Sequence, residues 1–121
     1  MKKIGLWIDN LMDRVRVEDQ LKKNGFQIEQ IGGLETCLRF LQTNSGMVII
    51  DLQNTSLAVD KMQHQMATRR ELAKRILSYF PHVQIHLKKG VEQCGIKHVY
   101  PRSVFFNDVA ALIQKVNEEE S

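Results

Sequence analysis

The chain has 121 residues and a mass of 14.0 kDa, enough for one hydrophobic core and too little for two, so we expect a single domain over residues 1–121. A composition of 43% hydrophobic and 26% charged residues is that of a folded protein and excludes a long disordered or low-complexity segment. The net charge of +3 is too small for a dedicated nucleic-acid binder, and two distant cysteines do not indicate a disulfide framework or a metal knuckle.

The first apolar run extends from Ile4 to Ile8 and is stopped by Asp9. It is far shorter than a signal peptide or a membrane span, so we expect a cytoplasmic protein without a membrane segment. Because a strand with one exposed face would alternate apolar and polar residues, this run predicts a strand that is buried on both faces.

Helix-like and strand-like patterns alternate along the rest of the chain, with caps and glycines between them. The most apolar run, Met47 to Ile50, ends at Asp51 and predicts the central strand. In chain order the predicted elements are a strand at 3–9, a helix at 11–23, an edge strand at 26–31, a helix from 34 to about 43, a strand at 47–50, a long helix at about 56–80, a strand at 83–87, a short strand at 97–100 and a helix at about 107–116.

This alternation predicts a doubly wound, five-stranded parallel sheet with helices on both faces. Few residues separate the last two strands, so we expect the fourth helix to be shortened or reduced to a loop at about 91–95. In such sheets the functional groups gather at the carboxyl ends of the strands.

Asp9 and Asp51 are expected at two such ends. Neighbouring carboxylates repel each other unless a cation or a proton lies between them, and Mg²⁺ is the cation that prefers oxygen ligands. Asp51 is then a candidate nucleophile for a phosphoryl group, with Asp9 as a metal-binding helper. The competing interpretation is that both aspartates cap helices.

The two strand ends also resemble a known family. Ile8-Asp9-Asn10 resembles the hydrophobic-Asp-Asp ending of the first strand in receiver domains of bacterial response regulators. Val48-Ile49-Ile50-Asp51-Leu52 is similar to the strand that ends in their phosphoacceptor aspartate, and the likeness extends over most of the chain. The resemblance implies a flavodoxin-like, CheY-like (βα)5 fold, with Asp51 as the phosphoacceptor and Asp9 and Asn10 in the acidic pocket.

Three departures from the family weaken that pocket. Asn10 replaces the second acid, and an amide is a poorer Mg²⁺ ligand than a carboxylate. The predicted fourth strand ends at Leu87-Lys88-Lys89, where the family has a hydroxyl. The family's lysine after the fifth strand is replaced by Arg102, so Arg102 and Lys88 are the candidate phosphate contacts.

We therefore expect a stand-alone, non-enzymatic module of two-component type that works by protein contact, with weakened or absent phosphorylation and at most a weak Mg²⁺ site at Asp9 and Asp51. The expected partner is a histidine kinase or a downstream effector. A homodimer stays open, with Phe105 and Phe106 as contact candidates.

Three alternatives remain. The first is a working Mg²⁺-dependent phosphoacceptor. The second is nucleic-acid contact through the basic residues of the predicted long helix, which include Lys61, Arg69, Arg70, Lys74 and Arg75. The third, most distant alternative is a flavin or small-molecule binder, for which the chain lacks a Ser/Thr-rich phosphate loop after its first strand.

Overall fold

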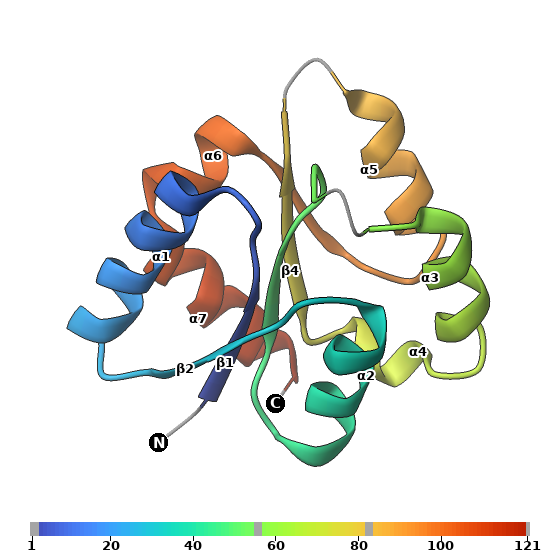
Figure 1. Ribbon diagram of the computed structural model, residues 1–121, viewed down its shortest axis with the longest axis horizontal. Helices are drawn as coiled ribbons and strands as arrows, with labels where there is room; N and C mark the ends of the chain where they lie inside the picture. The colour runs from blue at the N-terminus through green and yellow to red at the C-terminus, as the bar shows by residue number, and fades with distance from the viewer. Residues whose placement is uncertain (1–2, 55–56, 82–83, 121) are drawn as a thin grey trace.

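The computed structural model describes residues 3–54, 57–81 and 84–120 (Figure 1). Five parallel strands form one sheet in the order β2-β1-β3-β4-β5, so that β2 and β5 are the edges and β3 is central. The predicted fold class is confirmed. The strands are β1 (Lys3–Trp7), β2 (Gln27–Gln30), β3 (Val48–Asp51), β4 (Ile76–Phe80) and β5 (His98–Pro101).

Seven helices cover the two faces of this sheet, with α1, α6 and α7 on one side and α2 to α5 on the other (Figure 1). Side chains of β1 alternate between two cores, since Leu6 packs toward α1 and α7 while Trp7 packs toward α2 and α3. The helices are α1 (Leu11–Lys23), α2 (Leu34–Thr43), α3 (Val59–Met66), α4 (Arg70–Ala73), α5 (Ile85–Glu92), α6 (Arg102–Asn107) and α7 (Val109–Glu120).

The prediction of one long helix at 56–80 is wrong. The segment contains α3, the short α4 and then β4, every residue of which is buried. A strand that is buried on both faces has no period of two, so Ile76, Leu77 and Phe80 also fit a helical stripe. Ser56, the start of the predicted helix, lies outside the described residues.

The predicted strand at 83–87 is wrong, and the predicted loop at 91–95 is right only for residues 93–95, which form a turn after a short helix. The eight-residue helix α5 occupies residues 85–92, and Ile85, which alternation would place in the core, is 54% exposed. Val83 lies outside the described residues. The apparent alternation therefore came from the exposed and half-buried positions of a helix.

The basic residues of the predicted long helix do not share one face, because the helix is divided. Lys61 lies on α3, Arg70 on α4, and Arg75 follows α4 with its guanidinium turned inward. The continuous basic helix on which the nucleic-acid alternative depended is absent from this segment. None of the helices in the described part of the chain is long and apolar enough to cross a membrane.

Arg75 ties the start of β4 to the end of α2. One guanidinium nitrogen donates to the carbonyl oxygens of Asn44 and Gly46, at 2.8 and 2.7 Å, and another donates to that of Leu41. The last carbonyls of a helix have no intrahelical partner, so a buried helix end needs such a donor. The arginine therefore supplies hydrogen bonds that the backbone cannot.

We expect Arg75→Ala to lower the free energy of unfolding by about 2 kcal/mol, because several carbonyls lose a charged donor. Chemical denaturation measures the change. Lys74→Ala, at the exposed neighbouring position, is the matched control and should be close to neutral. Equal stability of the two variants would show that Arg75 is not a structural contact.

Candidate functional site

Asp51 is the last residue of β3 and lies buried at the carboxyl edge of the sheet, level with Tyr79 of β4. Its Oδ1 accepts a hydrogen bond from the backbone N–H of Gln53 at 2.9 Å. This bond turns the chain sharply after the strand, and it directs the carboxylate toward the segment that follows β1. The carboxylate of Asp51, at the end of β3, is therefore the first group of the site.

Asn54 joins the ends of β1 and β3. Its side-chain oxygen accepts from the backbone N–H of Asp9 at 2.8 Å, and its side-chain nitrogen donates to the carbonyl of Trp7. The amide is buried and satisfied at both ends, which fixes the loop after β1 beside the loop after β3. Asp9 itself is exposed. No local sequence pattern indicates the role of Asn54, because its bond to Trp7 spans 47 positions of the chain.

Asn10 caps the first helix. Its side-chain oxygen accepts from the backbone N–H of Asp13 at 3.0 Å, which is the usual bond of an N-cap asparagine. The asparagine at the family's second acidic position therefore acts as the N-cap of α1. The capped turn also places Asp13, a residue that the sequence analysis did not single out, inside the pocket.

Asp13 is the second buried carboxylate of the site, and Arg102 neutralises it. Both terminal nitrogens of the guanidinium bind the two carboxylate oxygens, with Nη2 at 2.6 Å from Oδ1. The hydroxyl of Tyr79 donates to Oδ2 at 3.1 Å. Arg102 is the first residue of α6, directly after β5, so the ion pair links the first helix to the far edge of the sheet. The one sign of this ion pair in the sequence is that Asp13 lies in the first turn of the first helix.

An aromatic ring supports the arginine. The guanidinium groups of Arg102 and Arg16 lie over the ring of Phe106, at 4.8 and 4.1 Å from its centre. Phe106 packs edge-on against Tyr79 and Phe105, and Phe105 is fully buried. The prediction of Phe105 as an exposed contact residue is therefore wrong, because its side chain packs in the core that the sheet forms with α1 and α7.

Burial raises the pKa of Asp51 above its ordinary value, and the negative charges of Asp13 and Asp9 raise it further. The N–H of Gln53 and the charge of Arg102 act in the opposite direction without reversing the shift. Burial also raises the pKa of the Tyr79 hydroxyl, which therefore stays a hydrogen-bond donor at neutral pH. Asp9, Asp13, Asp51 and Arg102 thus form one electrostatic unit.

The other family positions carry different groups. The last residue of β4 is Phe80, which has no hydroxyl, and Leu87-Lys88-Lys89 belongs to α5 instead. Lys88 lies within α5, so the prediction that it follows the end of the fourth strand is wrong. The wrong assignment of β4 caused that error.

The site retains two of the ligands that a divalent cation needs. The described residues contain no group of three or more His, Cys, Asp or Glu side chains that could hold a metal ion. The carboxylate of Asp13 forms an ion pair with Arg102, and the side-chain oxygen of Asn10 caps α1. Asp9 and Asp51 are the two carboxylates that would hold Mg²⁺, and an ion bound by one or two carboxylates completes its shell with water and phosphate. The side chains present therefore fit at most a weakly held Mg²⁺.

No protein-family profile and no curated protein matches the sequence. Solved structures match its fold. Full-length FixJ from B. japonicum has a TM-score of 0.78 at 16% identity, with 99% of this chain covering 59% of FixJ. The response regulator receiver domain protein from Clostridium thermocellum has a TM-score of 0.76 at 15% identity, over 99% of this chain and 97% of that one.

A third structure is the receiver domain of the sensor histidine kinase PA1611 from Pseudomonas aeruginosa, solved with a magnesium ion coordinated in its active-site cleft. Its TM-score is 0.74 at 12% identity, over 96% of this chain and 98% of that domain. The chain therefore has the fold of response-regulator receiver domains, as its two strand ends predicted.

Asp51→Asn tests the raised pKa. In wild type the folded protein favours the protonated carboxyl, so ionisation of Asp51 costs stability as the pH rises through its folded-state pKa. The amide cannot ionise and keeps an oxygen for Gln53. We expect the variant to be more stable than wild type at pH 7, by about 1.4 kcal/mol for each unit of raised pKa.

The difference should vanish below the ordinary aspartate pKa of about 3.9, where both states of the wild type are protonated. Denaturant midpoints between about pH 3 and pH 8 measure it. Asp60→Asn, at an exposed position of α3, is the control and should show no such trend. A less stable Asp51→Asn protein at pH 7 would contradict the interpretation.

Arg102→Ala should lower the free energy of unfolding by about 2 kcal/mol, a value discounted because the arginine side chain is 43% exposed. The loss comes from leaving the carboxylate of Asp13 buried without its cation. Arg16→Ala removes the other guanidinium on Phe106 and should cost only about 0.5 kcal/mol. Adding Asp13→Asn to Arg102→Ala should recover part of the loss, and a failure to do so would count against the ion pair.

Proposed function

We propose that residues 1–121 act as one receiver-like module of two-component signalling, without catalytic activity of its own, that works by protein contact with weakened or absent phosphorylation at Asp51. The observation that carries this proposal is the ion pair between Arg102 and Asp13. It engages the guanidinium that would otherwise be available to a phosphoryl group at Asp51.

Transfer of a phosphoryl group to a carboxylate depends on charges and donors that are free to stabilise the transferring oxygens. Here the guanidinium of Arg102 is bound to Asp13, and the Tyr79 hydroxyl donates to the same carboxylate. The remaining hydroxyl of β4, on Ser78, donates to the carbonyl of His98 at 3.1 Å. The polar groups around Asp51 are therefore already paired.

The competing function is a working Mg²⁺-dependent phosphoacceptor. It is favoured by the position of Asp51 at the end of the central strand and by the magnesium ion in the structure of the PA1611 receiver domain. It requires Arg102 to leave Asp13, or a cation to bind beside an arginine that repels it. The hydrogen bonds that Arg102 and Tyr79 donate to Asp13 disfavour both events.

An exposed apolar surface beside the site supports protein contact. Leu11, Met12 and Val15 of α1 are 61%, 75% and 48% exposed, and Val104 of α6 is 48% exposed. Exposed clusters of large apolar side chains commonly mark interaction surfaces. α1 and α6 also carry Asp13 and Arg102, so a partner on this surface would sense the state of the ion pair. We propose a histidine kinase or a downstream effector as that partner, with a second copy as the competing occupant.

Incubation with Mg²⁺ and a small phosphodonor, or with beryllofluoride, tests the proposal directly. Intact mass and the fluorescence of Trp7, which is buried in β1 two residues before Asp9, report the outcome. We expect wild type to gain no stable phosphoryl adduct and to show no Mg²⁺-dependent change in fluorescence. The physical reason is that the guanidinium of Arg102 and the hydroxyl of Tyr79 are already bound to Asp13.

Asp51→Asn is the control for any adduct. A phosphoryl adduct on wild type that this substitution abolishes would overturn the proposal in favour of the phosphoacceptor. Protein contact has its own readout: a partner captured from the source cells should bind wild type and Asp51→Asn equally, and Met12→Glu should lose it. Met12 is exposed, so this variant should fold normally.

A further inference from the structure

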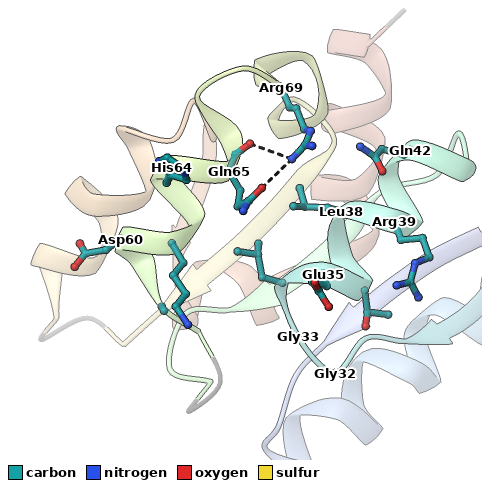
Figure 2. Close-up of a pocket in the computed structure, with 14 residues that line it drawn as sticks. Gly32, Gly33, Glu35, Leu38, Arg39, Gln42, Asp60, His64, Gln65 and Arg69 are labelled. Atoms are coloured by element: carbon teal, nitrogen blue, oxygen red, sulfur yellow. Dashed lines mark hydrogen bonds between the residues drawn. The ribbon is translucent and has the colours of Figure 1, made fainter.

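A second surface, on the opposite side of the sheet, has the form of a binding groove. A hollow of about 970 Å³ lies between α2 and the segment from α3 to Arg69 (Figure 2). Sites for small ligands and short peptide segments commonly have this size. The groove shares no lining residue with the Asp51 pocket, which faces α1 and α6.

The rim of the groove carries cations from both walls. Arg39 projects from α2 and Lys61 from α3, and neither forms an ion pair within the described part of the chain. Arg69 donates to the side chain and the backbone carbonyl of Gln65, at 3.0 and 3.4 Å, which holds its guanidinium in place without neutralising it. Figure 2 shows Arg39 and Arg69 at separate places around the hollow.

Part of the lining between these cations is apolar. Leu34 and Leu38 lie at the α2 side, and Leu38 is buried while Leu34 is half-buried. Among the described residues that line the groove there is no Phe, Tyr or Trp, so a nucleotide base would have only the imidazole of His64 on which to stack. Glu35 and Asp60 are also part of the lining, so the groove is not uniformly basic, which disfavours a continuous row of phosphates more than carboxylates spaced apart.

We propose that this groove binds an acidic, amphipathic peptide segment of a partner protein. Carboxylates spaced along such a segment can reach Arg39, Lys61 and Arg69 separately, while its apolar side chains cover Leu34 and Leu38. Separated charges over an apolar floor match a peptide better than a polyphosphate, whose charges are adjacent. The proposal does not depend on the state of Asp51, because the two surfaces lie on opposite sides of the sheet.

Binding of a fluorescein-labelled synthetic peptide of alternating glutamate and leucine, followed by anisotropy, tests the proposal on the full chain. Wild type should bind it, and the double variant Arg39→Glu/Lys61→Glu should bind about tenfold more weakly. Both positions are exposed, so the variant should fold, and far-UV circular dichroism checks this. Backbone amide shifts in NMR spectra should change at Leu34 and Leu38.

The matched control is Lys23→Glu/Lys97→Glu, which makes the same change in net charge at exposed positions outside the groove. It should bind like wild type, as should Asp51→Asn, and a peptide with glutamine in place of glutamate should not bind. Equal weakening by both double variants would overturn the proposal, because net charge alone would then explain binding.

Two other occupants are outcomes of the same experiment. If tripolyphosphate or a single-stranded oligonucleotide produces the shifts at Leu34 and Leu38 and the acidic peptide does not, the groove is a polyanion site and the proposal fails. If wild type is a dimer by sedimentation and Arg39→Glu/Lys61→Glu is a monomer, the groove is an interface between copies, and the proposal also fails. Absence of any peptide binding overturns it outright.

Discussion

A carboxylate inside a protein is costly unless a cation and hydrogen-bond donors accompany it, and Asp13 is such a carboxylate. It lies within the electrostatic reach of Asp51, so the pocket holds two buried acids. Arg102 resolves the repulsion with a fork of two N–H groups, and Tyr79 adds a third donor. The carboxyl edge of the sheet depends on this arrangement, because it joins the first helix, β4 and the segment after β5.

This constraint determines what the pocket can do. A cation built into the protein stabilises the acids permanently, whereas a bound metal ion would come and go with the ligand. Arg102 is further held by the ring of Phe106, which packs against Tyr79, so the cation and one of the donors share an aromatic support. The proposal of weakened or absent phosphorylation at Asp51 rests on this arrangement.

The two sides of the sheet offer different surfaces. Next to the pocket, α1 and α6 expose large apolar side chains, Met12 the most among them. Across the sheet, α2 and α3 enclose a groove with cations on its rim, including Arg39 and Lys61. The two partner segments proposed above differ in chemistry because one surface is apolar and the other carries cations on its rim. The sheet separates the two surfaces, and each can be altered by mutation without disturbing the other.

The sequence by itself determined the elements whose pattern is local. The first helix, with Asn10 as its cap, the central strand ending at Asp51 and the doubly wound sheet all follow from periodicity, caps and alternation. Tertiary structure decided the rest. A strand buried on both faces has no distinctive period, so β4 could be told from a helix only by its neighbours in the sheet. The contacts of Asn54 with the end of β1, and of Arg102 with Asp13, span 47 and 89 positions, and no local pattern encodes pairs so distant in the chain.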